Sequence, residues 1–238
     1  MLALDTATPW LSVAVGDRDG ARGSWTRAGR RTGAILAPAV AELCAELDCQ
    51  KTDVAAVAVG VGPGPYTSLR VGIMYAKSVG YALAVPVVGV CTHDAIARDA
   101  VRRALPAAGA PFLVATDARR REVYVARYDP SGERIGGPAV MTAAEACRSW
   151  PDDEWVATPG LTVPLPEDRL SPLFPDARVL VEMVAGAWPV DPASLGSVAG
   201  GWSEPRGPGN PEQQVPLGLL RPEPLYLRRP DAAEPVAR

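Results

Sequence analysis

The feature that most constrains the fold is an apolar run that leads through a glycine corner into a long helix. Val54–Val59 is β-branched and alanine-rich, which predicts a buried strand. The stretch GVGPGPYTSLRVG follows at 60–72, and Pro65 suits the first turn of a helix that runs to about Ala84. A second apolar run, Val85–Val90, comes next. Strand, helix and strand in this order predict a parallel unit, which needs helices on its faces.

Segments on either side of this unit extend the predicted sheet. Leu2–Leu4 and Leu11–Val15 predict two adjacent strands joined by a tight turn, and Gly20–Arg30 predicts a third, more exposed strand. Apolar residues at helical spacing predict an amphipathic helix over 33–47 and another helix after Val90. The residues that define these two helices are Leu36, Val40, Leu43 and Leu47, then Ile96, Ala100, Val101 and Leu105.

A second strand series begins after the loop at 106–111 and repeats the opening of the chain. Phe112–Thr116 and Glu122–Tyr128 predict two strands, followed by a turn at Asp129–Gly132. We therefore expect an α/β fold in two lobes, each with a mixed sheet flanked by helices. The expected boundaries are 1–108 for the first lobe, 109–223 for a smaller second lobe, and 224–238 for a tail that is ordered at Pro224–Arg228. Prolines and glycines crowd 189–224, which predicts a mobile loop there.

Composition excludes several classes of protein. The formal net charge of -3 offers no general attraction for nucleic acid. No stretch reaches the roughly 18 apolar residues of a membrane span, so we expect a cytoplasmic protein. The four cysteines show no C-x-x-C spacing, and we expect reduced thiols rather than a zinc site or a disulfide framework. They are Cys44, Cys49, Cys91 and Cys147.

The glycine corner does not match the common phosphate-binding motifs. No lysine follows the glycines as a P-loop requires, and Pro65 occupies the last glycine position of G-x-G-x-x-G. The corner is then either a tight turn or a place where the amides at 66–68 bind an anion. Small residues recur at every fourth position of the helix that follows, so a second backbone can approach one face closely, within the chain or across a subunit interface. These residues are Ser68, Gly72, Ala76, Gly80 and Ala84.

Several motifs together resemble one family. DTATPWLSVAV, GPGPYTSLRVG, AKSVGYALAVPVVGV, DARRREVYVARY and EPLYLR, in this order between residues 2 and 228, resemble the TsaB (YeaZ) family of bacterial tRNA threonylcarbamoyladenosine proteins. The sequence departs from the family pattern at Pro65, Tyr66 and Ser68, where Ser, Phe and Gly are usual. A histidine common before the first long helix is replaced by the region of Arg31 and Thr32.

The resemblance implies an actin-like ATPase-domain fold (ASKHA, ribonuclease H-like). It also implies a non-catalytic role in forming N6-threonylcarbamoyladenosine (t6A) in tRNA, with a TsaD-type transferase and a TsaE-type ATPase as partners. The two long helices of the first lobe would bind the transferase or form a homodimer, with no cofactor except ATP or ADP at the partner interface. The interface residues implied in this way are Leu36, Val40, Leu43, Tyr66, Ser68, Leu69, Arg70, Gly72, Ile73, Ala76, Gly80 and Ala84.

The sequence lacks the paired histidines of the related transferases and supposed metalloproteases. Thr92 and Ile96 stand at the H-x-x-x-H positions, and His93 is the single histidine of the chain. Two imidazoles therefore cannot share a metal, so neither a metal site nor a metallopeptidase is expected.

Two alternatives stay open at this point. Asp5 and Thr6 end the first strand, and Asp117 ends its counterpart in the second lobe, so they could line a nucleotide cleft of an actin-like ATPase or small-molecule kinase. The basic run Arg119–Arg121 is either a solvated hairpin or a set of phosphate contacts to tRNA that partners hold.

Overall fold

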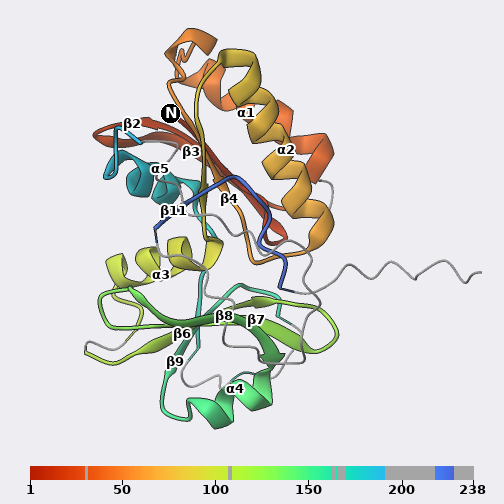
Figure 1. The fold of residues 1–238 in the computed structure, drawn as a ribbon, viewed down its shortest axis with the longest axis vertical. Coiled ribbons are helices and arrows are strands. Elements are labelled where there is room, and N and C mark those ends of the chain that lie inside the picture. The colour runs from red at the N-terminus through yellow and green to blue at the C-terminus, as the bar shows by residue number, and fades with distance from the viewer. Residues whose placement is uncertain (30–31, 107–108, 162–164, 166–169, 191–217, 228–238) are drawn as a thin grey trace, which may run out of the picture.

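The computed structural model describes residues 1–29, 32–106, 109–161, 165, 170–190 and 218–227. These residues form two lobes, each built on one mixed β-sheet, and Figure 1 shows the lobes stacked along the long axis. The two-lobed α/β architecture predicted from the sequence is confirmed.

The first lobe contains a six-stranded sheet in the order β11-β5-β4-β1-β2-β3. Strand β1 is parallel to β4, β4 is parallel to β5, and β2 is antiparallel to both β1 and β3. The predicted parallel unit therefore lies at the centre of this sheet. The strands are β1 (Leu2–Asp5), β2 (Trp10–Asp17), β3 (Gly20–Ala28), β4 (Val57–Gly60), β5 (Val87–Val90) and β11 (Leu219–Leu220).

The second lobe repeats this arrangement in a five-stranded sheet with the order β10-β9-β6-β7-β8. Strand β6 takes the place of β1, because it is antiparallel to β7 and parallel to β9. The prediction that the chain opens its second lobe as it opens its first is confirmed. The strands are β6 (Phe112–Asp117), β7 (Glu122–Tyr128), β8 (Arg134–Thr142), β9 (Glu154–Ala157) and β10 (Leu170–Pro172).

Helices cover both faces of the first sheet. Helices α1 (Thr32–Glu46) and α2 (Tyr66–Leu83) lie side by side on one face, and α5 (Ala177–Ala185) packs on the other (Figure 1). Because side chains alternate along a strand, Leu2 and Leu4 of β1 pack in the core under α1 and α2, whereas Ala3 packs against α5.

Helix α3 (Thr92–Arg102) lies between the lobes (Figure 1). Ala95 joins the first-lobe core beside α5, whereas Ile96 and Ala100 join the second-lobe core with Phe112 of β6. Helix α4 (Ala143–Ser149) covers the opposite face of the second sheet. One helix, α3, thus contributes to the cores of both lobes.

Strand β5 begins at Val87 rather than at Val85, and the structure differs from the sequence prediction in three further places. Strand β4 begins at Val57 rather than at Val54, because Val54 caps the short 3-10 helix η1 (Lys51–Asp53) and bonds to the carbonyl of Lys51. Strands β8–β11 and helices α4 and α5 were not predicted from the sequence. Helix α5 and strand β11 pack on the first sheet, so the chain returns to the first lobe within the range 109–223 assigned to the second.

Parts of two predictions lie outside the described residues. Of the Pro/Gly-rich segment 189–224, the structure describes only 189–190 and 218–224, so its predicted mobility stays a prediction. The predicted ordered tail is described as far as Leu227, and Arg228 lies beyond it.

Candidate partner interface

The small-residue face of α2 packs within the chain. A Cβ atom on Gly72 would collide with the Thr6 side chain, and one on Gly80 would collide with Val87. The Thr6 hydroxyl also donates a hydrogen bond of 2.7 Å to the carbonyl of Ser68. The two glycines therefore allow the helix to approach the first sheet closely, which decides between the two explanations that the sequence left open.

Eight of the predicted interface residues are consequently not available to a partner. Their side chains or Cα atoms are buried in the first-lobe core beneath the two helices, so the prediction that they contact a partner directly is wrong. Tyr66 and Ser68 are half-buried, Arg70 and Ala84 are exposed, and for these four the prediction stands. The buried eight are Leu36, Val40, Leu43, Leu69, Gly72, Ile73, Ala76 and Gly80.

The outer face of α2 carries an exposed stripe that the sequence analysis missed. Met74 is 56% exposed and Tyr81 is 91% exposed, and they are two of the three large hydrophobic side chains exposed among the described residues. Arg70 and Lys77 are also exposed and complete a series at 70, 74, 77 and 81. Residues at this spacing lie on one face of a helix, so the periodicity could have revealed the stripe. We call these four residues the α2 stripe.

The C-terminal segment is fixed beside the start of the α2 stripe. The Tyr66 ring stacks on Tyr226 with centroids 4.9 Å apart, and the Arg70 guanidinium lies 5.1 Å from the centroid of the Tyr66 ring. The amide of Leu225 donates a 2.8 Å hydrogen bond to the carbonyl of Val61 in the glycine corner. Leu225 and Tyr226 of the EPLYLR motif thus pack on the glycine corner and on the first residue of α2.

Helix α1 supplies a surface of different chemistry next to α2. Its exposed residues are mostly small, and the acidic ones lie in the second half of the helix. Small side chains leave a flat surface, and carboxylates complement the Arg70 and Lys77 charges of the α2 stripe. The exposed residues of α1 are Gly33, Ala34, Ala37, Pro38, Ala41, Glu42, Ala45 and Glu46.

The predicted nucleotide cleft does not reach Asp5 or Thr6. Both residues are fully buried. The Asp5 carboxylate accepts hydrogen bonds from the amide of Ala7 at 2.8 Å and from the Thr92 hydroxyl at 2.7 Å. Gly60 leaves the space that the carboxylate fills, since a Cβ there would collide with it. Burial raises the pKa of the Asp5 carboxyl to about 6, although both hydrogen bonds act to lower it.

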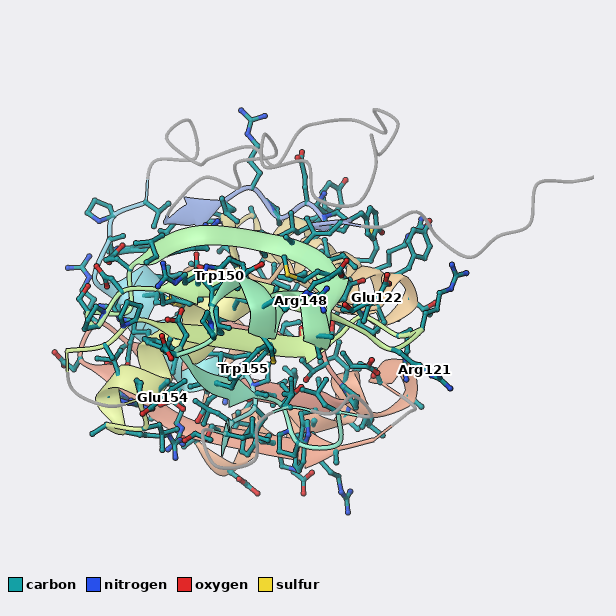
Figure 2. The ribbon with its side chains drawn as sticks, turned by 90° about the horizontal axis from the view of Figure 1, so that it is seen from below. Arg121, Glu122, Arg148, Trp150, Glu154 and Trp155 are labelled. Atoms are coloured by element: carbon teal, nitrogen blue, oxygen red, sulfur yellow. The ribbon has the colours of Figure 1, made fainter. Side chains whose placement is uncertain are left out.

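Asp117 is bound within its own hairpin. Its carboxylate accepts a 2.8 Å hydrogen bond from the amide of Arg119 and lies 3.2 Å from the guanidinium of the same residue. Arg119, Arg120 and Arg121 all have positive φ angles, of 63°, 55° and 64°. Their side chains are exposed, and Figure 2 shows Arg121 at the edge of the second lobe, away from Trp155 in its interior. The hairpin therefore presents three cationic side chains outward.

His93 is a core residue rather than a metal ligand. Its Nε2 atom lies 2.9 Å from the Thr116 hydroxyl, and its buried Nδ1 atom has no hydrogen-bond partner. Burial, and then the charge of Arg134, lower the pKa of the imidazole to about 3. Of the two positions expected for metal histidines, Thr92 binds Asp5 and Ile96 is packed in the second-lobe core. Among the described residues, no group of three His, Cys, Asp or Glu side chains is placed to hold a metal ion.

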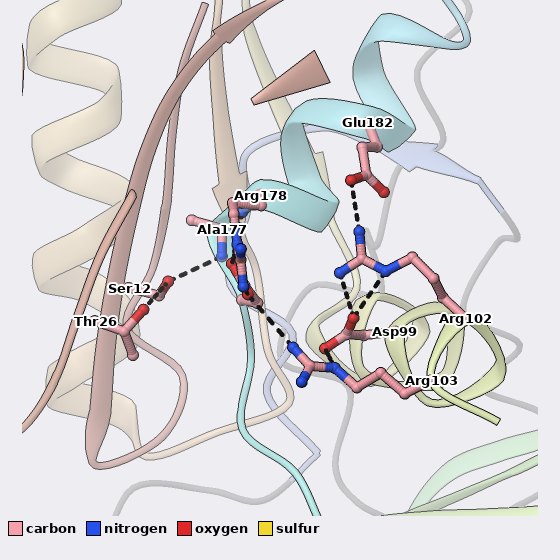
Figure 3. A network of polar contacts seen from close by, with 9 residues as sticks. Ser12, Thr26, Asp99, Arg102, Arg103, Ala177, Arg178 and Glu182 are labelled. Carbon is pink, nitrogen blue, oxygen red and sulfur yellow. Dashed lines mark hydrogen bonds and ion pairs between the residues drawn. The ribbon is translucent and has the colours of Figure 1, made fainter. Parts of the chain in front are cut away.

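Charged residues of α3 connect it to both lobes. Asp94 accepts hydrogen bonds from the Tyr128 hydroxyl at 2.8 Å and from Arg134 at 2.9 Å, both in the second lobe. On the side of the first lobe, Arg102 binds Asp99 of α3 and Glu182 of α5, the latter at 2.7 Å (Figure 3). These contacts hold the lobes together and support the sheet on which α1 and α2 lie.

Across the described part of the chain, no helix is long and apolar enough to traverse a bilayer.

Comparisons with known proteins identify relatives of this chain. A family model described as TsaD, tRNA N6-adenosine threonylcarbamoyltransferase, matches residues 26–174. An uncharacterized protein of Mycobacterium tuberculosis is 37% identical over 247 residues, covering 100% of this chain and 95% of its own length. The tRNA threonylcarbamoyladenosine biosynthesis protein TsaB of Escherichia coli is 33% identical over 128 residues, 54% of each chain.

A solved structure extends the similarity to most of the fold. YeaZ from Pseudomonas aeruginosa superposes with a TM-score of 0.65 at 31% identity, covering 79% of this chain and 91% of YeaZ. Together with the repeated sheet topology, this similarity confirms the actin-like fold class that the motifs imply.

Proposed function

The chain belongs to the TsaB (YeaZ) family, and from that premise we propose that it is a non-catalytic subunit required for t6A formation in tRNA. In this role it binds and stabilises a TsaD-type transferase and enables a TsaE-type ATPase to cycle with the complex. The observation that carries the proposal is the α2 stripe, an exposed row of interface-type side chains on a helix whose inner face is fully engaged with its own sheet.

The chemistry of the α2 stripe suits a protein partner. Tyr, Met and Arg are enriched at protein interfaces, and a few such residues supply most of the binding energy. Met74 and Tyr81 would be covered by the partner, whereas Arg70 and Lys77 would lie at the rim. The same surface supports a homodimer when the partner is absent, because the exposed carboxylates of α1 complement those two cations.

The site chemistry favours a non-catalytic role. The paired metal histidines of the related transferases are replaced by Thr92 and Ile96, and both side chains are committed to the fold. Asp5, the residue that would address a magnesium nucleotide, has both carboxylate oxygens engaged inside the protein. The chain therefore needs no cofactor of its own, and ATP or ADP would bind at the shared interface.

The tRNA would be held mainly by the partners. The Arg119–Arg121 hairpin adds exposed cations on a protein whose net charge is otherwise -3. Arginine side chains bind phosphodiester groups in a salt-dependent way without reading base sequence. This chain would then contribute phosphate contacts at the edge of the complex, not recognition of the modified adenosine.

A reconstituted modification assay tests the role. The purified chain, a TsaD-type transferase, a TsaE-type ATPase, a source of threonylcarbamoyl-adenylate and tRNA are combined, and t6A is measured with and without the chain. We expect modification to require the chain, while the chain alone shows no ATP turnover above that of Asp5→Asn. Modification that proceeds equally well without the chain would contradict the proposal, and ATP turnover lost in Asp5→Asn would favour the ATPase alternative.

A matched pair of variants tests the surface. Tyr81→Ala combined with Met74→Asp should weaken transferase binding by roughly 30-fold or more, since each hot-spot residue contributes about 2 kcal/mol and about 1.4 kcal/mol is tenfold. Ile135→Asp is the control, because Ile135 is 53% exposed, close to the 56% of Met74, but lies on β8 of the second lobe. Equal binding by both variants in calorimetry would remove the α2 stripe from the interface.

A further inference from the structure

Helix α1 ends in a Schellman motif that brings two cysteines together. Asp48 has a φ of 49°, the left-handed conformation that terminates such helices. The amide of Cys49 donates a 2.8 Å hydrogen bond to the carbonyl of Cys44, and the amide of Asp48 donates one of 3.3 Å to the carbonyl of Ala45. These are the two hydrogen bonds that define the motif, with Cys44 three residues before the cap residue Leu47 and Cys49 two residues after it.

Side chains at these two positions of a Schellman motif usually contact each other. Here both belong to cysteines, and both are half-buried against the first-lobe core. The Cys49 thiol donates a hydrogen bond of 3.8 Å to the carbonyl of Gln50. Burial, and then the nearby Cys49 side chain, raise the pKa of the Cys44 thiol. The backbone hydrogen bond between the two residues therefore places both thiols on the same turn at the end of α1.

We propose that Cys44 and Cys49 are a redox modification site, at which glutathione disulfide or a similar small-molecule disulfide oxidises the two thiols to an intramolecular disulfide. The thiolate of one cysteine attacks a sulfur of the small disulfide, forming a mixed disulfide and releasing one small thiolate. The thiolate of the other cysteine then attacks the protein sulfur of that mixed disulfide and releases the second. The protein loses two electrons and two protons, and the small disulfide is reduced to two thiols.

The backbone is suited to this bond. A disulfide needs Cα atoms a few ångströms apart and side chains directed toward each other, and a direct hydrogen bond between the two backbones meets the first requirement. The other cysteines lack such a partner among the described residues. Cys91 is fully buried, and burial raises the pKa of its thiol strongly, whereas Cys147 lies on α4 in the second lobe. The reaction is thus selective for one pair.

Oxidation would fix the end of a helix that belongs to the proposed interface. The bond would hold Glu46, Leu47 and Asp48 in their turn, next to Tyr75 of α2, which interacts with Cys44. Partner binding by oxidised protein would then differ from binding by reduced protein. This regulatory consequence rests on the proposed function, but the formation of the disulfide does not.

Peptide mass spectrometry tests the disulfide without any partner. The folded full-length protein is equilibrated in glutathione redox buffers, the remaining thiols are alkylated after unfolding, and the peptides are identified. We expect a peptide pair linked through Cys44 and Cys49, with Cys91 and Cys147 alkylated. Four alkylated cysteines in every buffer, glutathione adducts alone, or links between different molecules would overturn the proposal.

Single substitutions test which cysteines form the disulfide. Cys49→Ser should abolish the internal link and leave a glutathione adduct on Cys44, whereas Cys147→Ser should keep the link. Circular dichroism confirms that each variant is folded, and the wild-type result stands even where a variant fails to fold. Transferase binding is then compared between oxidised and reduced protein. Equal binding with the disulfide present would refute only the regulatory consequence, and absence of binding in both states would refute the proposed function.

Discussion

The hydroxyl of Thr92 donates a 2.7 Å hydrogen bond to the Asp5 carboxylate, which joins the end of β1 to the start of α3. Both side chains are fully buried, so this contact is part of the protein interior.

The contribution of Asp5 to stability should fall as the pH rises through the titration of its carboxyl. Burial raises the pKa of its carboxyl from 3.8 to about 6, so the folded state binds more protons than the unfolded state between these values. Each pKa unit corresponds to about 1.4 kcal/mol, which gives a loss of about 2 to 3 kcal/mol from this group. Asp5→Asn should remove that slope in urea unfolding measured from pH 4 to 7. An unchanged slope in the variant would show that Asp5 does not titrate in this window.

The contribution of His93 to stability should change with pH in the opposite direction. Burial lowers the pKa of its imidazole from 6.5 to about 3, so the unfolded state binds the proton first and stability is lost as the pH falls below 6.5. His93→Gln should flatten the acid side of the stability profile while Asp5 still titrates. Unfolding of the double variant with Asp5→Asn, measured over the same range, separates the two slopes. Acid sensitivity that persists in His93→Gln would assign it to other groups.

Two glycine-to-alanine changes should have opposite effects. Gly72→Ala places a Cβ against the Thr6 side chain and should cost about 1 to 3 kcal/mol, as overpacking does. Gly33→Ala is the control on exposed α1, where the nearest atom outside the helix backbone is 3.9 Å away, and should stabilise by up to about 1 kcal/mol. Thermal unfolding of both variants measures the difference. Equal stabilities would contradict the close packing of α2 on the sheet.

The ion pair between Asp94 and Arg134 should be important for the contact between the lobes. The Arg134 side chain is only 3% exposed, and removing it leaves the Asp94 charge with fewer partners. Arg134→Met should therefore cost about 3 to 5 kcal/mol, as breaking a buried pair does. Arg22→Met, in the exposed pair with Asp17, should cost less than about 1 kcal/mol. Denaturant unfolding measures the loss of stability in both variants. Similar losses would show that the buried ion pair stabilises the protein no more than the exposed one.

The arginine hairpin should affect tRNA affinity of the assembled complex. Arg121→Glu should weaken tRNA binding and reduce its salt dependence, because a phosphate contact releases condensed counterions. Arg148→Glu, an equally charged change at an exposed position of α4, is the control (Figure 2). Filter binding at several salt concentrations gives both slopes. Identical slopes for the two variants would place the hairpin away from the RNA.

The sequence by itself predicts most of the elements of the first lobe and the repeat of its topology in the second. The apolar runs at 54–59, 85–90 and 112–116 are continuous, and runs of this kind predict buried strands. The motif resemblance predicts the family and the actin-like fold, which the comparisons confirm. Strand β8 and helix α5 escape prediction because β8 contains Gly136, Gly137 and Pro138, and α5 is short.

Tertiary structure alone decides which face of a helix is available. Gly72 and Gly80 permit close packing in the sequence, but only the position of Thr6 and Val87 shows that the first sheet occupies that face and leaves Met74 and Tyr81 outside. Periodicity determines what an element can bury, whereas the partner of each buried face depends on contacts between residues distant in the chain.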